Sequence, residues 1–584
     1  MARSYFVLVH ANREADERTI IEAALSTAGM RQRIATPFFT VFASDQIGAL
    51  ILPGHGIILG DLYRRDGHPA TRTSDLPTPT SAGAFRTQIL THYWGDYVLV
   101  QPTEGDSSGI RATRSPSPAC DLQCVYSLIG GRGFLTSDIT LAERANLYRR
   151  RVDFQHLAHR LAYPGLKSDS TGLAGIRELL PGCSIELRNK TVHIERDWNP
   201  WDFVGDQIRD SDQNEAASAV RSSIETVIRV WASEDKSILL ESSGGLDSSI
   251  VGACLKGTPA RLTCATLTTS VPGADEREYA SLVADGLGVD LLASELTYGD
   301  AKLQFPIAPE LVTPAVGPLQ YAIDVTMRDI ADRENTGSYY SGGGGDTVFG
   351  YLTNATPAAD AFLAAGLATG LRTVREISEF HQCTYWKASR LTLRRLASGR
   401  RTPHRTDLSL LPRNAPLPDS EPHPWLEHPG APLPGCLQRV YELSSTQFFR
   451  DSCPRSLARR MRMPLLSQPV IEACLRVPSW MWFHGGQNRA IARLAFSHEL
   501  PPRILARRSK GTFTAYLGAI YRRRMKDMLD LLLGGELEAH RLLDTGKLLE
   551  MAERDIPRND NAFMRLFQLC TYENWIREQT KMGR

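Results

Sequence analysis

Short apolar runs separated by turn residues fill the first third of the chain. Runs of this length, rich in β-branched and aromatic residues and bounded by glycine or aspartate, are typical of strands. The sequence therefore predicts strands at Tyr5 to Val9, Gly56 to Leu59, Tyr97 to Gln101 and Gly133 to Thr136. A turn at Leu180-Pro181-Gly182 leads into one more alternating run, Cys183 to Leu187, at the end of this strand-rich domain.

From Glu215 onward the apolar spacing changes to that of a helix. Val220, Ile224, Val227 and Trp231 are 4, 3 and 4 residues apart, which places them on one helix face. Strands and helices then alternate, which is typical of βαβ units and a parallel sheet. The expected strands are Ile238–Leu240, Arg261–Leu267 and Leu291–Leu296, and the expected helices are Ser248–Lys256 and Asp275–Leu287, with Ala280, Val283, Ala284 and Leu287 facing inward.

The polar stretch from Gly205 to Asn214 is the best candidate linker, so we expect two domains, residues 1–205 and 206–584. Within the second, nine prolines fall between Pro403 and Pro434, which predicts an exposed loop without regular structure. An arginine-rich amphipathic stretch precedes this loop. Two interpretations stay open for it, a solvated helix face or a surface that binds an acidic peptide; its arginines are Arg390, Arg394, Arg395, Arg400 and Arg401.

Composition narrows the class of protein. The 584 residues include 67 Lys and Arg against 65 Asp and Glu, so no overall positive field favours nucleic acid. No apolar run approaches the roughly 18 residues that span a bilayer, and the first run is too short for a signal peptide. We therefore expect a cytoplasmic protein with no membrane partner. Ten dispersed cysteines suit reduced thiols, and Cys120 and Cys124 have no second pair at metal spacing.

The segment Ser242 to Ser249, between a predicted strand and a predicted helix, carries the first candidate chemistry. Its glycines let the backbone approach a phosphate, and the helix N-terminus adds positive potential. An aspartate in such a loop would repel phosphate unless a cation lay between them, so Asp247 is predicted to bind Mg²⁺. The loop lacks the lysine of a kinase-type P-loop.

A second glycine-rich segment, Tyr339 to Tyr351, again follows a β-prone run and again places an aspartate, Asp346, beyond glycines. In an open parallel sheet, ligands bind at the carboxyl ends of the strands. Two such loops at adjacent strand ends would hold one nucleotide between them.

These motifs resemble the asparagine synthetase superfamily. Ser243 to Ser249 are similar to its pyrophosphate loop, Asp275-Glu276 with Tyr279-Ala280 to its acidic helix start, Ser341 to Tyr351 to its second loop, and Leu500-Pro501-Pro502 with Ile504, Arg507, Lys510 and Phe513 to a later stretch. The resemblance implies an ATP-dependent ligase that forms an acyl-adenylate and passes it to an amine. It implies that Asp247 and Asp346 hold Mg²⁺ and that Lys510 stabilises charge in the transition states. It also implies that Ser341 and Gly342 contact the adenylate and that pyrophosphate is bound by Ser243, Gly244, Gly245, Asp247, Ser248 and Ser249.

The N-terminal domain resembles a class II glutaminase at three turns, Gly60-Asp61, Gly95-Asp96 and Leu180-Pro181-Gly182. The resemblance implies an α/β protein with an N-terminal αββα layer arrangement of the Ntn type, followed by an ATP-pyrophosphatase domain with added helices. That glutaminase family uses a processed N-terminal cysteine, and this chain begins Met1-Ala2-Arg3. We therefore expect the domain to act as a scaffold without glutamine hydrolysis.

A second departure lies at Gly343, where asparagine synthetases have glutamate and β-lactam synthetases have tyrosine. The base for the amine would then be Glu376, Glu379 or His381, or the amine would be a low-pKa α-amine that needs little help. Together the departures resemble the lasso-peptide macrolactam synthetases. These join an Asp or Glu side chain of a ribosomal precursor peptide to its new N-terminus, with a leader-peptide protease and a leader-recognition protein as partners. The alternatives are an asparagine or β-lactam synthetase-like ligase, and an inactive binding scaffold.

Overall fold

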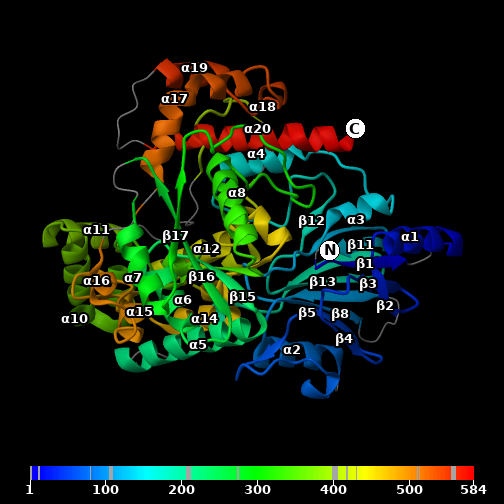
Figure 1. Cartoon of the computed structure of the whole chain (residues 1–584), viewed down its shortest axis with the longest axis horizontal. Helices are drawn as coiled ribbons and strands as arrows, with labels where there is room; N and C mark the ends of the chain where they lie inside the picture. Colours follow the sequence, from blue (N-terminus) through cyan, green and yellow to red (C-terminus); the bar gives the residue numbers. More distant parts are fainter. Residues whose placement is uncertain are drawn as a thin grey trace.

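The computed structural model describes residues 3–10, 14–78, 81–103, 109–204, 212–271, 275–397, 406–415, 419–428, 430–508, 511, 513–553 and 561–584. We refer to residues 3–204 as the N-terminal part and to residues 212–584 as the C-terminal part. Figure 1 shows the strands of the first part in blue and cyan and most of the parallel strands of the second in green.

The N-terminal part contains two six-stranded antiparallel sheets. The first has the order β12-β10-β11-β1-β3-β2, with β1 (Tyr5–His10), β2 (Arg31–Ala35), β3 (Phe39–Ala43), β10 (Val125–Ile129), β11 (Arg132–Thr136) and β12 (Arg177–Glu178). The second has the order β14-β13-β9-β8-β5-β4, with β4 (Ala49–Leu52), β5 (Gly56–Gly60), β8 (Tyr97–Pro102), β9 (Ile110–Arg114), β13 (Cys183–Arg188) and β14 (Thr191–Arg196). All five strands predicted in this region are present.

Side-chain alternation along these strands builds four layers. On β1, Tyr5 and Val7 point into the core between the sheets, whereas Phe6 and Leu8 pack against α1 (Ala15–Thr27) and α3 (Ile139–Arg144). On the other sheet, Ile58 faces α2 (Ala82–His92). The order helix, sheet, sheet, helix confirms the expected αββα arrangement (Figure 1).

The C-terminal part is built around a five-stranded parallel sheet with the order β17-β16-β15-β18-β19. Its strands are β15 (Ser237–Glu241), β16 (Arg261–Thr269), β17 (Leu291–Leu296), β18 (Ser338–Ser341) and β19 (Arg460–Arg462). Helix α5 (Gln213–Glu234) precedes the first of these strands, and the first four strands are connected in turn by α6 (Leu246–Leu255), α7 (Arg277–Leu287) and α8 (Pro318–Arg333). The predicted parallel sheet is thus confirmed, and the four apolar positions predicted on α5 are all buried. On α7, Ala280, Val283 and Ala284 are buried, whereas Leu287 is half-buried.

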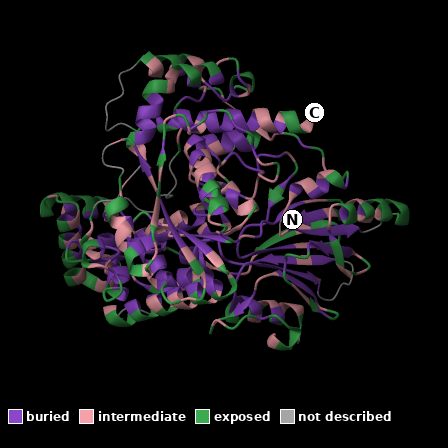
Figure 2. Cartoon of the chain, viewed as in Figure 1, coloured by how far each residue is buried: buried purple, intermediate pink, exposed green. Residues whose placement is uncertain are grey.

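Helices make up most of the remaining chain. They are α9 (Gly345–Val348), α10 (Thr356–Phe380), α11 (Tyr385–Ala397), α12 (Pro434–Ser445), α13 (Phe448–Asp451), α14 (Gln468–Arg476), α15 (Ala490–Ala495), α16 (Pro502–Ala506), α17 (Thr514–Leu532), α18 (Glu536–Ala539), α19 (Thr545–Glu553) and α20 (Met564–Gly583). Much of α20 is buried, and it runs beside α4 (Phe154–Ala162) of the N-terminal part (Figures 1 and 2). Among the described residues, no helix combines the length and apolarity needed to cross a membrane.

Buried ion pairs join the two parts. Arg462 on β19 lies 3.3 Å from the Asp235 carboxylate of its own part and 3.8 Å from Asp96 in the N-terminal part. Farther along the same interface, Lys167 pairs with Glu178 at 2.6 Å and with Asp451 at 3.2 Å. Removing one member of such a buried pair leaves a charge without compensation, so these contacts hold the two parts in one arrangement.

The proline-rich segment is not wholly exposed, which corrects the expectation from sequence. His423 and Trp425 are 0% exposed. The Trp425 indole donates to the Pro181 carbonyl of the N-terminal part at 3.0 Å, and Trp201 donates to the Trp425 carbonyl at 2.7 Å. Proline excludes ladder hydrogen bonds but not burial, and here an aromatic side chain anchors the segment.

Candidate functional site

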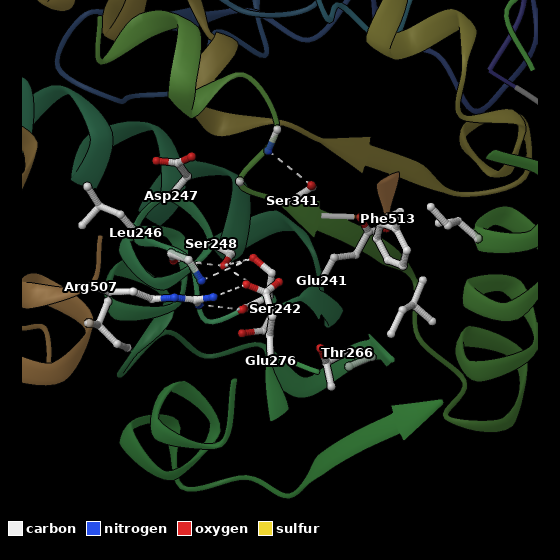
Figure 3. Close-up of a pocket in the computed structure, with 18 of the residues that line it drawn as sticks. Glu241, Ser242, Leu246, Asp247, Ser248, Thr266, Glu276, Ser341, Arg507 and Phe513 are labelled. Atoms are coloured by element: carbon white, nitrogen blue, oxygen red, sulfur yellow. Dashed lines mark hydrogen bonds and ion pairs between the residues drawn. The ribbon is translucent and has the colours of Figure 1, made fainter. Parts of the chain in front are cut away.

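The carboxyl ends of β15, β16 and β18 lie side by side and border a cavity of about 300 Å³. This is the edge at which parallel sheets bind ligands. Figure 3 shows the cavity with Glu241, Asp247, Ser248, Ser341, Arg507 and Phe513 around it. Of the residues predicted to bind nucleotide, those that line the cavity are Ser243, Gly245, Asp247, Ser248, Ser341 and Gly342. Both predicted loops therefore meet at one cavity.

The first loop is closed by its own hydroxyl groups. Ser248 Oγ accepts from the Ser243 backbone N–H at 3.3 Å, and Ser243 Oγ accepts from the Gly245 N–H at 3.3 Å. Gly244 has φ +61°, and a Cβ there would lie 2.3 Å from Tyr279 Cβ, so this position requires glycine. Ser249 is buried and donates to the Gly245 carbonyl at 2.7 Å, so its hydroxyl fixes the helix start and does not face the cavity.

Glycines in the second loop allow it to pack against the first. A Cβ on Gly342 would lie 2.5 Å from the Ser248 nitrogen, and one on Gly345 would lie 2.4 Å from Asp247 Cγ. Gly344 has φ +84° and faces Leu466 equally closely. Only Gly343 in this run has room, since its nearest neighbour is Met463 Sδ at 3.4 Å. Three of the four glycines thus serve loop packing, and the fourth position could carry a Cβ without a clash.

Asp247 and Asp346 converge on one cation, Arg489. Arg489 Nη1 lies 3.1 Å from Asp247 Oδ1 and 2.9 Å from Asp346 Oδ1. Arg489 immediately precedes α15 and has φ +54°, and its guanidinium lies 5.3 Å from the ring centroid of Tyr351. The two carboxylates are therefore near enough to share a single cation. Nothing in the sequence pattern pointed to Arg489.

The carboxylate pair fits a hard divalent cation. Mg²⁺ is commonly held by one or two carboxylates together with substrate phosphates and water. Among the described residues, no group of three or more His, Cys, Asp and Glu side chains is arranged to hold a metal. A metal at Asp247 and Asp346 would accordingly need ligands from the nucleotide, and it would take the position that the Arg489 guanidinium holds.

The segment around Arg507 also borders the cavity. Arg507 donates to the Gly244 carbonyl at 3.1 Å, forms an ion pair with Glu276, and stacks 4.0 Å above the Tyr279 ring. Glu276 also accepts from the Gly511 N–H at 2.9 Å. The Asp275-Glu276 and Arg507 motifs noticed in the sequence thus meet at the first loop. Lys510 lies outside the described residues.

The cavity also contains charged residues that sequence reasoning missed. Glu241, at the end of β15, pairs with Arg455, whose Nε lies 3.1 Å from Glu241 Oε1, and the Arg455 N–H donates to Asp324 at 2.7 Å. Burial and the charge of Arg489 lower the pKa of Arg493 to about 10, so it stays protonated at neutral pH. Arg455 gives no local signal in the sequence, because its partners Glu241 and Asp324 are more than a hundred positions away.

The three proposed bases lie elsewhere. Glu376 accepts from the Gly486 N–H at 2.8 Å, and Glu379 pairs with Arg375 at 2.8 Å. Burial lowers the pKa of His381. None of the three is among the described residues that line the cavity.

In the N-terminal part, Met1 and Ala2 lie outside the described residues. Arg3 pairs with Asp61 at 2.8 Å. Cys120 and Cys124 are buried thiols, and burial raises their pKa values to about 12 and about 11. Neither thiol is therefore activated as a nucleophile.

Two of the solved structures that match this chain have low similarity to it. One is titled "Structure of the allosteric regulatory enzyme of purine biosynthesis" (8% identity, TM-score 0.21, covering 52% of this chain and 76% of that one). The other is glutamine phosphoribosylpyrophosphate amidotransferase from B. subtilis complexed with ADP and GMP (9% identity, TM-score 0.21, covering 52% and 83%). No curated protein matches.

A family model gives a clearer result over the part of the chain that holds the cavity. The model described as Asparagine synthase matches residues 220–577, which include both glycine-rich loops, Arg489 and Arg507. This range is more than half of the chain. The protein therefore belongs to the asparagine synthase family, whose members are ATP-dependent, AMP-forming amide ligases.

Proposed function

We propose that this ligase closes a macrolactam ring in a ribosomally made lasso peptide. It would adenylate an Asp or Glu side chain of the peptide and join it to the peptide's N-terminal amine, releasing AMP and pyrophosphate. The observation that carries the proposal is Gly343. This position lacks any side chain although a Cβ there would meet only ordinary van der Waals neighbours, the nearest being Met463 Sδ at 3.4 Å, and a ligase for ammonia or a small amine would need an assisting group here.

In the first step a peptide carboxylate oxygen attacks the α-phosphorus of ATP, and the bond to the β-phosphate oxygen breaks as pyrophosphate leaves. The first loop offers backbone N–H groups and the start of α6 to the leaving phosphates. Arg489 and Arg493 lie at the same cavity and supply positive charge. Asp247 and Asp346 would hold Mg²⁺, which when bound neutralises phosphate charge.

In the second step the amine nitrogen attacks the acyl carbon, AMP departs with the electrons of the acyl–oxygen bond, and the nitrogen loses one proton to water. An α-amine has a pKa of about 7.7 to 8.0, so a substantial fraction is neutral at physiological pH without a base. Tethering the amine and the activated carboxyl in one peptide supplies effective molarities of roughly 10⁵ M or more. None of the three bases expected from the sequence is among the described residues that line the cavity, which is compatible with such an intramolecular reaction.

Two alternative functions remain to be distinguished by experiment at the same site. An asparagine or β-lactam synthetase-like ligase would use the same loops, but it would need a group at Gly343 to assist its amine. An inactive scaffold for a peptide-maturation complex would not need the Asp247–Arg489–Asp346 arrangement. A leader-peptide protease and a leader-recognition protein are the partners we propose, and we propose a cytoplasmic location.

The test offers the full chain ATP and Mg²⁺ with either aspartate plus ammonium or a leader-free peptide from the short reading frame nearest its gene. Loss of one water from the peptide, dependent on a free N-terminus and an internal Asp or Glu, is the expected result. Asparagine formed from free aspartate would replace the proposal with the first alternative. No ATP–pyrophosphate exchange with any carboxylate would favour the scaffold.

A further inference from the structure

Helix α11 is an appendage with an uncovered outer face. It packs chiefly against α10, toward which it buries Ala388 and Thr392. Its outer face exposes Trp386 at 80% and Leu393 at 65%. On α10, beyond a kink at Gly366, Leu367 is exposed at 69%. The two helices lie at the edge of the molecule (Figures 1 and 2). Large apolar side chains gathered on one surface usually mark an interaction site.

The same surface carries excess positive charge. Between residues 363 and 397 the chain has six Lys and Arg against two Glu. Both acids are engaged, since Glu376 accepts from the Gly486 N–H and Glu379 pairs with Arg375. The exposed basic side chains are Arg372, Arg375, Lys387, Arg390 and Arg394. A partner for this surface must bring negative charge.

The arrangement of residues selects the kind of partner. Trp386, Arg390 and Arg394 are four residues apart, so apolar and basic side chains share one row along α11. An interfacial helix in a lipid bilayer needs its apolar and charged side chains on opposite faces, which this row does not provide. A second copy related by a two-fold axis would bring these basic rows against each other. An acidic peptide with apolar side chains matches both components.

This surface is linked to the reaction site through packed side chains. Phe380, at the end of α10, packs edge-on against Tyr351, and Tyr351 lies under Arg489. The hairpin of β20 (Phe483–His484) and β21 (Gln487–Asn488) also packs on α10 and leads directly into Arg489. A peptide whose reacting end lies at Gly343 could thus extend toward α11.

We propose that the α10–α11 surface binds an acidic, apolar-bearing segment of the peptide substrate, outside the residues that react. This rests on the proposed function, since it takes the substrate to be a peptide. The surface would hold the chain while the reacting groups meet in the cavity, so it would contribute to KM and not to the chemistry.

A binding measurement without ATP tests the surface independently of catalysis. The full-length protein is titrated into a fluorescein-labelled peptide with Leu recurring at three- and four-residue spacing and Glu elsewhere, or its Lys-for-Glu counterpart, and anisotropy is followed. We expect binding of the Glu peptide only, weakened on the order of 10-fold by Arg390→Glu/Arg394→Glu. Trp386→Ala should also weaken it. Arg522→Glu/Lys526→Glu, the same charge change at the same spacing on α17, should not.

Kinetics then test whether the bound segment belongs to the substrate. With the leader-free peptide, Arg390→Glu/Arg394→Glu should raise KM by a similar factor and leave kcat and the thermal unfolding midpoint unchanged. Equal Glu-peptide affinity in the charge-reversal and control variants would overturn the proposal. In a parallel titration with phosphatidylglycerol vesicles, binding to the vesicles but not to the Glu peptide would overturn it too. Weakened Glu-peptide binding with an unchanged KM would overturn the assignment to substrate. If no peptide is cyclised, the proposed function fails. The anisotropy titration does not measure cyclisation, so the two failures can be told apart.

Discussion

Arg489 and Asp247 are 242 positions apart in the chain, yet Arg489 Nη1 lies 3.1 Å from the Asp247 carboxylate. The same nitrogen lies 2.9 Å from Asp346. The Arg489 guanidinium thus lies where a metal ion shared by the two loops would bind. The first prediction concerns the charges of the Asp247 and Asp346 carboxylates.

Asp247→Asn and Asp346→Asn should each lower ATP–pyrophosphate exchange on the order of 10²-fold or more, because each removes a metal-binding charge without changing side-chain volume. The thermal unfolding midpoint should change little. Asp285→Asn, on the exposed face of α7, is the matched control. Near-normal exchange in Asp247→Asn would refute the metal assignment.

Arg489→Ala should make the protein respond to Mg²⁺ without nucleotide. In the native protein the guanidinium competes with a metal for the two carboxylates, whereas in the variant they repel each other and attract a free cation. Differential scanning fluorimetry should show a larger Mg²⁺-induced rise in unfolding midpoint for Arg489→Ala than for wild type or Arg489→Lys. Identical shifts in all three would show that no metal enters between the carboxylates.

Lys510→Ala should lower kcat on the order of 10²-fold or more with little change in the KM for ATP. The resemblance to asparagine synthetases gives Lys510 a role with charge that develops as the phosphoryl and acyl centres react. Steady-state kinetics with ATP and the peptide measure both constants. An effect confined to KM would assign Lys510 to nucleotide binding.

The Glu178 ion pair should make stability depend on acid pH. Burial alone would raise the pKa of Glu178, but the charges of Lys167 and Arg114 outweigh burial and hold it well below its ordinary value. A lowered carboxyl pKa contributes stability above the unfolded pKa of about 4.3 and loses it as pH falls toward the folded value. Glu178→Gln should therefore cost about 3 kcal/mol near pH 7.

The difference in unfolding free energy between wild type and Glu178→Gln should shrink as pH falls below about 4.3. Urea unfolding at several pH values measures that difference, and other carboxylates cancel from it because both proteins carry them. A difference that stayed constant down to pH 3 would mean that Glu178 contributes through packing instead of charge.

Local patterns sufficed for the two glycine-rich loops and for some of the strands and helices of this protein, but not for the contacts between them. The strand, loop and helix around Asp247 were predictable because spacing and glycine content are read over a dozen residues. β19 was missed, since three residues with two arginines carry no strand pattern. Arg489 and Trp425 were missed for another reason. Their roles depend on partners far away in sequence, and no local rule predicts such pairings.

The contacts of Trp425 limit how the N-terminal and C-terminal parts of this protein can be separated or combined with parts of other proteins. Its indole donates to the Pro181 carbonyl and its backbone carbonyl accepts from the Trp201 indole, while Arg462 meets Asp96 across the same interface. Expressed alone, the C-terminal part would present a bare tryptophan and a half-compensated buried arginine to solvent, so it should be recovered as aggregate. A chimera with an N-terminal part from another ligase would need matching partners at all these positions, so the two parts are expected to be exchanged and inherited together.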